Sequence, residues 1–471
     1  MNIILGKNGC GKSFLLKNVE QHVKSIGTIG NTRYISPERG GFVSYEAGIE
    51  QAIINNLNWM SDNRRKNQSE NFRQQSAYLF RQLELLELRA IEKDQLKLGY
   101  TPRTFDATVD QINTLLDRVR IEREKSKAFL IKDKETDAAI TSESLSSGES
   151  ELVSLGIEFL SFVSEAQQDK ANLLFIDEPD AHLHPDLQDR LAKFLVKIVK
   201  AKPVKLIIAT HSTALVSSLS SRADVNIAFM RRKDTKLSFK PVSDVDRSIL
   251  PIFGAHPLSN VFNEAPILLI EGEDDERVWQ QAVRSSNGRI RVYPCAIDGG
   301  AHFADFETEV NNVIEAVYDN AKAFSLRDRD LQPAEIDDFG HVVRMRLSCR
   351  AAENLMLSDE VLASTGVTWP GLETLIGSWL KVNQDHQYYA AMQEFVDGGL
   401  DRKVHDLKSI RNILVGLMSN KPWEVLVGRA IAALANGKPA KGPVAPGSLS
   451  DYLGEKVRDL ILGLAQQPQA A

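Results

Sequence analysis

The first thirteen residues of the chain constrain its fold more than any other stretch. They read MNIILGKNGCGKS, a short apolar run followed by a glycine-rich segment. Residues 6–13 match the P-loop pattern G-x-x-x-x-G-K-S/T, and apolar residues follow at helical spacing. Strand, glycine loop and helix form the context in which backbone N–H groups surround phosphate oxygens. The sequence therefore predicts a nucleotide site at Asn8, Gly9, Cys10, Gly11, Lys12 and Ser13. We expect Lys12 to reach the β and γ phosphates of ATP and Ser13 to hold Mg²⁺.

Length and composition limit the class of protein. A chain of 471 residues is too long for one core and predicts two or three domains. Its 43% hydrophobic and 25% charged residues are typical of globular proteins, and no apolar run approaches the roughly 18 residues of a membrane span. The net charge of −6 does not indicate nucleic-acid binding. Three cysteines without metal-type spacing, and no signal peptide before the first strand, predict a cytoplasmic protein without membrane partners.

Strand and helix patterns divide the chain into four segments. Residues 1–240 predict a P-loop α/β domain with a mainly helical insertion at about 45–120. An irregular stretch rich in proline and glycine, residues 241–265, predicts a linker. Strands alternate with helices again over residues 266–360, which predicts a second α/β domain. Residues 361–471 are predicted to be a helical C-terminal extension.

Three further motifs follow the P-loop in the first domain. Leu145 to Glu149 reads LSSGE and opens a helix, and a continuous apolar run over 172–176 ends in Asp177 and Glu178. A second buried strand ends before His211. Each motif is weak alone, because acidic pairs often cap helices and a histidine after a strand is usually structural.

In this order the four motifs resemble the ABC-type ATPases, including the branch of SMC and Rad50. The resemblance implies that Asp177 supports Mg²⁺, that Glu178 polarises the attacking water and that His211 senses the γ-phosphate. Phosphoryl transfer depends mainly on such positioning and charge neutralisation. The signature residues Ser147, Gly148 and Glu149 would contact nucleotide bound by a second protomer. The resemblance thus implies a homodimer, or a larger even-numbered oligomer, joined through the ATPase heads, with Asp180 and His182 in the loop that crosses the dimer interface.

Two departures from that family leave parts of the site open. Only five residues precede the P-loop, so we expect adenine stacking to come from elsewhere or to be absent. A glutamine is expected after the strand that ends at Ser36, where the sequence has Pro37, Glu38 and Arg39. Either Glu38 or Gln51 could replace it.

A second set of acidic residues follows residue 265. A strand over 267–270 ends in Glu271, and a strand over 323–326 leads to Asp328 and Asp330, with Asp298 closing the strand between them. The carboxyl ends of parallel strands share one edge of a sheet. Carboxylates crowded there repel one another unless a cation neutralises them, and oxygen ligands suit Mg²⁺ or Mn²⁺. The alternative is a set of solvated acidic loops that cap helices.

This acidic pattern resembles the Toprim domain of topoisomerases, primases and OLD-family nucleases. The resemblance implies metal ligation and catalysis by Glu271, Asp328 and Asp330, with Asp275 and Glu353 as further metal ligands. A lysine that stabilises the leaving oxygen is also implied, and the sequence does not choose among Lys403, Lys408, Lys421 and Lys438.

An ABC-type head followed by a Toprim domain resembles the OLD family, many of whose members serve in bacterial anti-phage defence. The resemblance implies an ATP-hydrolysing, metal-dependent endonuclease acting on nucleic acid, with DNA favoured over RNA and a defence-system partner protein conceivable. Cleavage of RNA, including tRNA, stays open as an alternative. So does a nucleotide-switched ATPase scaffold that recruits a partner effector. A Rad50-like repair ATPase is disfavoured because the sequence has no long heptad array.

Overall fold

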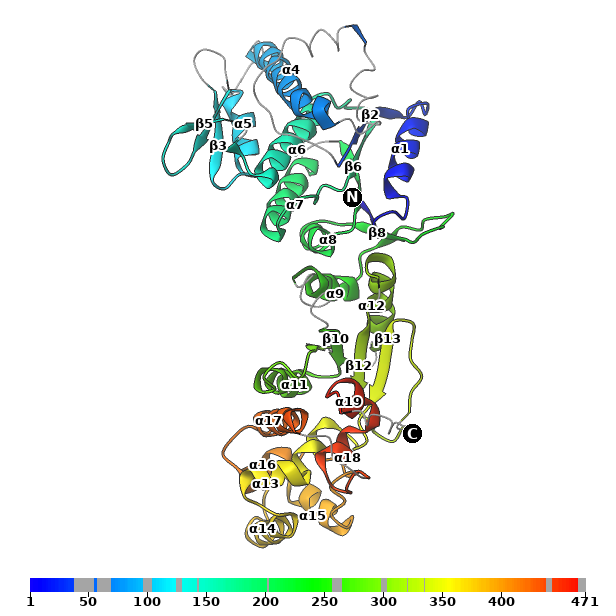
Figure 1. Ribbon diagram of the computed structural model, residues 1–471, viewed down its shortest axis with the longest axis vertical. Helices are drawn as coiled ribbons and strands as arrows, with labels where there is room; N and C mark the ends of the chain where they lie inside the picture. The colour runs from blue at the N-terminus through cyan, green and yellow to red at the C-terminus, as the bar shows by residue number, and fades with distance from the viewer. Residues whose placement is uncertain are drawn as a thin grey trace, which may run out of the picture. The chain divides into compact units, whose positions relative to one another are not determined.

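The computed structural model divides the chain into two compact units, Met1–Pro257 and Leu258–Ala471 (Figure 1). Within them it describes residues 1–37, 55–56, 69–95, 104–123, 129–141, 144–200, 203–255, 265–297, 303–319, 321–333, 335–437 and 443–464. Among these described residues no helix is long and apolar enough to span a membrane.

A six-stranded sheet forms the centre of the first unit. Its strand order is β2-β6-β7-β1-β8-β9, and every pair is parallel except β8 with β9. Continuous apolar runs occupy the middle strands, as expected for strands buried on both faces. The strands are β1 (Asn2–Gly6), β2 (Ile29–Ile35), β6 (Ala171–Asp177), β7 (Val204–Thr210), β8 (Asn226–Met230) and β9 (Lys240–Pro241).

Helices cover this sheet. Residues on all sides of α6 are buried, which fits its apolar composition around the whole helix. The helices are α1 (Lys12–Val23), α6 (Ser147–Ser164), α7 (Pro185–Val199), α8 (Thr213–Ser220) and α9 (Asp244–Ala255). Helix α9 corrects the predicted irregular linker at 241–265. Ser243 and Asp246 cap its start reciprocally, and Ile249, Leu250 and Phe253 are buried on it.

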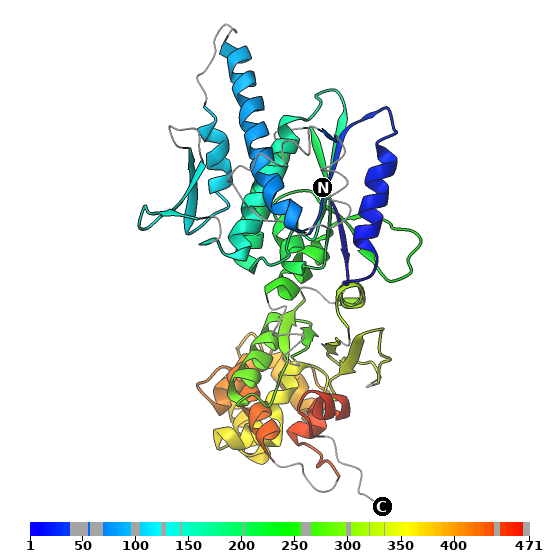
Figure 2. The same cartoon turned by 45° about the horizontal axis from the view of Figure 1, so that its top comes forward.

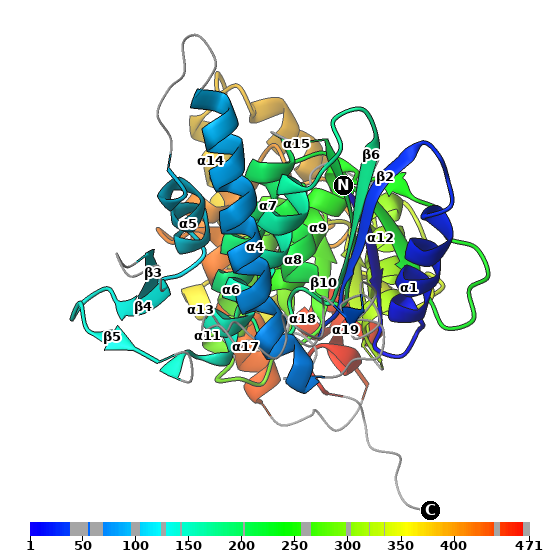
Figure 3. The same cartoon turned by 90° about the horizontal axis from the view of Figure 1, so that it is seen from above.

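The described part of the insertion contains a long helix, a short helix and a small antiparallel sheet. Helix α4 (Ser69–Gln95) packs along α6, as Figure 2 and Figure 3 show. The rings of Phe80, Phe105 and Phe129 pack together and join α4 to the small sheet. Its other elements are α5 (Asp106–Asn113), β3 (Val119–Arg123), β4 (Phe129–Asp133) and β5 (Ala139–Ile140).

The second unit contains a four-stranded sheet in the order β11-β10-β12-β13, with all strands parallel. The strands are β10 (Ile267–Ile270), β11 (Tyr293–Ala296), β12 (Ala323–Arg327) and β13 (Val342–Arg346), and the helices between them are α11 (Glu273–Ser285) and α12 (Phe303–Val317).

The C-terminal helices share one hydrophobic core with this sheet, which runs from Leu268 to Leu464. Helix α17 packs closely on α11 because Gly428 has no side chain, and a Cβ there would lie 2.6 Å from the carbonyl oxygen of Val278. The helical region is therefore part of the same folded unit. It comprises a 3-10 helix, η3 (Ala352–Leu357), α13 (Asp359–Thr365), α14 (Trp369–Val382), α15 (Tyr389–Asp397), α16 (Arg411–Met418), α17 (Trp423–Asn436), α18 (Leu449–Leu453) and α19 (Glu455–Leu460).

Candidate functional site

The P-loop connects β1 to α1 at the carboxyl edge of the larger sheet. Gly11 precedes α1 with a φ of 106°, a left-handed conformation that favours glycine. A Cβ on Gly6 would lie 2.5 Å from the carbonyl oxygen of Met230 on the neighbouring strand β8. The loop therefore needs glycine at both positions, one for conformation and one for space.

Lys12 is buried at the start of α1. Its Nζ donates to the carbonyl oxygens of Gly6, at 2.7 Å, and Lys7, at 3.0 Å. The same ammonium lies 2.9 Å from Oε1 of Glu178, which follows β6. The lysine predicted to bind phosphate and the predicted catalytic carboxylate therefore form an ion pair.

Glu178, Asp180 and His211 lie together beyond the ends of β6 and β7. Among the described residues they are the one set of three acidic, histidine or cysteine side chains whose ligand atoms come within 4.8 Å of one another. Nδ1 of His211 lies 2.5 Å from Oε2 of Glu178, and this hydrogen bond raises the pKa of His211. Burial opposes ionisation of Glu178, but His211 and Lys12 outweigh it and lower the pKa of Glu178. The arrangement favours a charged Glu178 beside a charged His211.

The side chain of Asp180 contacts residues of its own chain. It is buried and accepts a short hydrogen bond from Thr210, and burial raises its pKa. The sequence assigned Asp180 and His182 to a loop that crosses a dimer interface. In the structure His182 is exposed, with a φ of 60°, whereas Asp180 is an internal support for the end of β7.

Asp177 ends β6 beside the P-loop. It accepts a hydrogen bond from the hydroxyl of Tyr34 at 2.7 Å and another from Ser13. Burial raises the pKa of Asp177 despite these two hydrogen bonds. Ser13 and Asp177 therefore have the adjacency and the oxygen chemistry that a Mg²⁺ bound with nucleotide requires.

The signature segment opens α6. Ser146 caps the helix reciprocally with Glu149, whose carboxylate also accepts from Arg118 at 3.0 Å. The sequence placed Glu149 among the nucleotide-contacting residues, but its carboxylate is occupied inside its own chain. Ser147 is exposed, and Gly148 lies against Leu187, where a Cβ would come within 2.8 Å of the leucine side chain.

In the second unit, three segments that are distant in sequence bring acidic residues to one edge of the sheet. Glu271 follows β10, Asp275 lies in the first turn of α11, and Asp328 follows β12. Glu353, on η3, is the fourth member, and these four residues are called the acidic cluster below. Asp328 accepts a backbone hydrogen bond from Ala352 at 3.0 Å, which fixes η3 beside β12.

Burial and mutual repulsion perturb this acidic cluster. Burial, with added repulsion from Glu353 and Glu271, raises the pKa of Asp275 to about 7. Burial, with repulsion from Asp275, Glu271 and Glu353, raises the pKa of Asp328 to about 8. Burial and repulsion from Asp330 raise the pKa of Glu271. Asp330 itself is exposed and has a left-handed backbone conformation with a φ of 47°. A positive charge placed in the cluster would relieve this repulsion.

Two cations from the C-terminal helical region face the acidic cluster. Nζ of Lys408 lies 4.0 Å from Oδ2 of Asp328, and the charges of Glu353 and Asp328 raise the pKa of Lys408 against the effect of its partial burial. Arg411 contacts Asp274 at 2.8 Å and Glu353 at 3.5 Å. No sequence pattern indicated Arg411, because its partners lie far away in the chain.

The structure separates Lys408 from the other lysines considered. Lys403 pairs with Asp451 at 2.7 Å, and Lys421 is exposed after α16. Lys438 lies outside the described residues, as do the candidates Glu38, Gln51 and Asp298.

The chemistry of the acidic cluster fits a hydrated divalent cation. No three of its carboxylates, within the described parts of the chain, come within 4.8 Å of one another. Mg²⁺ retains several waters in most protein sites and binds directly to only one or two carboxylates. A hydrated Mg²⁺ or Mn²⁺ ion would therefore not need three of these carboxylates as direct ligands.

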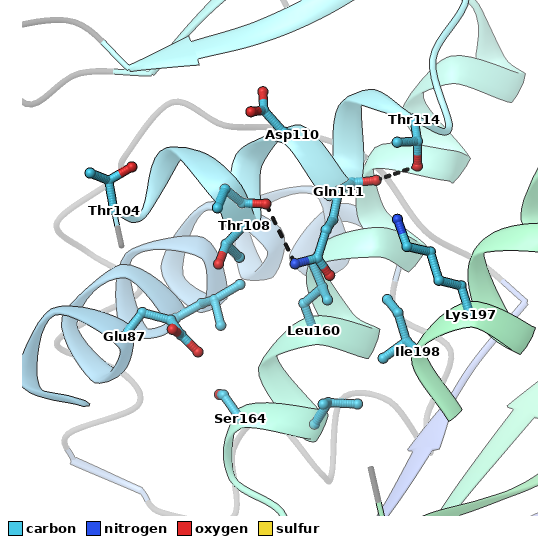
Figure 4. A pocket seen from close by; sticks show the side chains of 13 residues that line it. Glu87, Thr104, Thr108, Asp110, Gln111, Thr114, Leu160, Ser164, Lys197 and Ile198 are labelled. Carbon is cyan, nitrogen blue, oxygen red and sulfur yellow. Dashed lines mark hydrogen bonds between the residues drawn. The ribbon is translucent and has the colours of Figure 1, made fainter. Parts of the chain in front are cut away.

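A cavity of about 650 Å³ lies elsewhere, among α4, α5, α6 and α7 (Figure 4). Leu160 lies toward its interior, and Glu87, Asp110 and Lys197 provide charged groups around it. Gln111 and Thr114 donate to backbone carbonyls of α5. None of the predicted site residues lines this cavity, so it is separate from both candidate sites.

The fold and motif geometry of the first unit define a P-loop ATPase domain of mixed α/β architecture. A family model described as an AAA ATPase domain matches residues 35–216. No curated protein matches the chain.

Several solved structures match part of this chain. An Smc head bound to the C-winged helix domain of ScpA is 20% identical, with a TM-score of 0.24, over 30% of this chain and 44% of that one. The SMC head domain from Thermotoga maritima is 17% identical, with a TM-score of 0.23, over 34% of this chain and 52% of that one. An inward-facing metal-chelate type ABC transporter is 15% identical, with a TM-score of 0.27, over 54% of this chain and 78% of that one. The chain thus spans about half the length of the two SMC structures.

Proposed function

We propose that the chain is a metal-dependent nuclease whose activity is set by the nucleotide state of its ATPase domain. The observation that carries the nuclease proposal is the convergence of Glu271, Asp275, Asp328 and Glu353 at one sheet edge, with Lys408 facing them. The raised pKa values of Glu271, Asp275 and Asp328 are typical of a site that binds a cation. The resemblance to Toprim and OLD-family enzymes supports the same chemistry.

The acidic cluster and Asp330 would hold one or two Mg²⁺ or Mn²⁺ ions. Such ions, when bound, activate water and stabilise the leaving oxygen in phosphodiester hydrolysis. The chain itself supplies Lys408, whose ammonium would pair with a non-bridging or leaving oxygen of the phosphate. Arg411 holds Glu353 in place beside it.

In the ATPase domain, ATP would replace the internal partners of Lys12. A phosphate at the P-loop supplies the negative charge that Glu178 supplies in the structure. Glu178 would then lose its contact with Lys12 and orient water, and His211, hydrogen-bonded to it, would contact the γ-phosphate. Exposed Ser147, at the start of α6, would face the nucleotide of a second copy of the chain. Head pairing would couple ATP to the acidic cluster.

The experiment compares Asp328→Asn with the wild-type chain on plasmid DNA, linear DNA and RNA including tRNA. Each substrate is incubated with Mg²⁺ or Mn²⁺, with and without ATP. Asp385→Asn is the matched control, because Asp385 is an exposed acid of the same unit. Loss of cleavage in Asp328→Asn alone supports the proposal, and the cleaved substrate decides between DNA, which we favour, and RNA. Equal cleavage by both variants would refute the assignment.

Head pairing has its own measurement. The mass of the wild-type chain and of Glu178→Gln, with and without ATP, should show an ATP-dependent even-numbered oligomer that is longer-lived in the variant. ATP-dependent capture of a defined partner protein, with no cleavage of any nucleic acid, would favour the scaffold alternative. Infection of cells that express the wild type or Asp328→Asn tests the proposed cytoplasmic role in anti-phage defence.

A further inference from the structure

Phe14 is an exposed aromatic residue next to the predicted nucleotide site in the sequence. Its side chain is 75% exposed, and it directly follows Ser13 in the first turn of α1. Lys12, Leu16 and Glu20 form the buried face of this helix. Since consecutive residues are about 100° apart around a helix, Phe14 points away from the sheet. The ring therefore makes little use of its apolar surface within the chain.

The direction of a bound nucleotide follows from the strand order. β1 carries the P-loop and lies between β7 and β8. The groups that would act on the γ-phosphate, Glu178 and His211, lie beyond β6 and β7. A triphosphate is a linear chain, so we expect its nucleoside end to leave the P-loop away from Glu178 and His211, on the side of β8.

A cationic loop follows β8 on that side. Gly6 is paired with Met230, and the Met230 side chain lies 3.4 Å from the Cβ position of Gly11. The residues that follow Met230 and precede β9 carry four cations and one acid, and all but Arg231 are exposed: Arg231, Arg232, Lys233, Asp234 and Lys236. This loop, residues 231–236, provides positive charge where the α-phosphate and sugar would lie.

We propose that Phe14 is the platform on which the base of the bound nucleotide stacks, with loop 231–236 beside its sugar and α-phosphate. This inference rests on the proposed nucleotide site and names its missing base contact. A phenylalanine ring offers a π face and no hydrogen bond, so it accepts any purine. The site therefore takes purine nucleoside triphosphates and separates adenine from guanine poorly.

The test measures binding of Mg²⁺ with ATP, GTP, CTP and inorganic tripolyphosphate to the full chain by calorimetry. The variants are Phe14→Ala, Phe14→Trp and the control Val382→Ala, which removes a side chain that is 83% exposed in the second unit. Stacking of one base on an aromatic side chain corresponds to about five- to a hundredfold in affinity. We expect Phe14→Ala to lower the affinity for ATP and GTP by about that factor and to leave the affinity for tripolyphosphate unchanged. Phe14→Trp should restore the affinity, with tryptophan fluorescence quenched by ATP.

The outcomes separate the stacking from the nucleotide site. Wild-type affinity for ATP in Phe14→Ala, or an equal loss for ATP and tripolyphosphate, would overturn the stacking role. A strong preference of the wild type for ATP over GTP would overturn the purine-tolerant site. A wild-type chain that binds neither ATP nor tripolyphosphate would refute the proposed nucleotide site itself.

Discussion

Nζ of Lys12 and Oε1 of Glu178 lie 2.9 Å apart, with 3% and 15% of their side chains exposed. The residue that should bind phosphate and the residue that should orient water therefore neutralise each other. Under the proposed function, binding of nucleotide would exchange the carboxylate partner of Lys12 for phosphate. Glu178 would then lose its contact with Lys12 and keep its hydrogen bond to His211.

Replacement of Glu178 separates ATP binding from hydrolysis. Glu178→Gln removes the charge that orients water, so phosphate release should fall by at least about a hundredfold, the lower range for loss of a general base. ATP affinity should stay the same or increase, because Lys12 no longer has a competing carboxylate. Phosphate release and ATP binding are measured on the same preparation. Glu135→Gln, at an exposed position, is the control, and equal loss of binding and hydrolysis would contradict the prediction.

The acidic cluster should make stability depend on pH. Asp275 and Asp328 have pKa values of about 7 and about 8, above their ordinary value of 3.8. At a pH between the ordinary and the raised values, the folded chain therefore binds more protons than the unfolded chain. The free energy of unfolding should therefore fall as the pH rises from about 4 to about 8.

Asp328→Asn should make this fall shallower, and Asp385→Asn should not. Mg²⁺ should oppose the fall by supplying the missing positive charge, with an affinity that increases about tenfold per pH unit for each proton displaced. Thermal unfolding across this pH range, with and without Mg²⁺, measures both effects. Parallel pH curves for the wild type and Asp328→Asn would argue against a perturbed Asp328.

Lys408 should act on the phosphate rather than on folding. Its side chain is 61% exposed, so Lys408→Ala should change the melting temperature little. Cleavage should fall by about a hundredfold, the usual effect of removing one group that stabilises a developing charge. Lys408→Arg should recover part of the rate, and Lys421→Ala, which removes another exposed lysine, should match the wild type. Comparable loss in both alanine variants would remove the special role of Lys408.

Arg411 and Arg277 offer a matched comparison of two arginines that share a partner. Both contact Asp274, but Arg411 is 22% exposed and also reaches Glu353, whereas Arg277 is 59% exposed. Arg411→Leu should lower the free energy of unfolding by about 1.5–3 kcal/mol, the range for hydrogen bonds to charged groups. Arg277→Leu should cost less than about 1 kcal/mol, as for a surface ion pair. Chemical denaturation measures both, and similar costs would contradict the assigned difference.

Two glycines in neighbouring helices should respond in opposite directions. Gly428→Ala in α17 places a methyl group 2.6 Å from a backbone oxygen of α11 and should destabilise the unit by about 1–3 kcal/mol. Gly416→Ala in α16 has open space around its Cβ and should stabilise it by about 0.5–1 kcal/mol. Denaturation midpoints give the signs, and a stabilising Gly428→Ala would show that α11 and α17 can separate at little cost.

The P-loop and the strand ends could be predicted from the sequence because their signals are local. A glycine at a fixed spacing, or an acid after an apolar run, reports the end of a strand without knowledge of its neighbours. The positions of Glu271 and Asp328 followed from the same rule, since strands of one parallel sheet end at one edge. Asp275 and Glu353 do not follow strands, and only the resemblance to the Toprim domain indicated them.

What could not be predicted depends on contacts between distant segments. Lys408 could be distinguished from Lys403 only in the structure, where Lys403 forms an ion pair with Asp451. Glu149 matched a family motif, but in the structure its carboxylate accepts hydrogen bonds from Ser146 and Arg118. For α9, Pro251 suggested an irregular linker although Ser243 and Asp246 form a capping pair that could have indicated a helix.

The single core that joins β10 to the C-terminal helices can be completed only late in synthesis of the chain. Glu271 leaves the ribosome about 140 residues before Lys408, and the core is complete only when residues near Leu464 have emerged. A growing chain therefore carries the acidic cluster without its facing cation and without a finished fold. Under the proposed function, an unfinished nascent chain cannot cleave the nucleic acid around it.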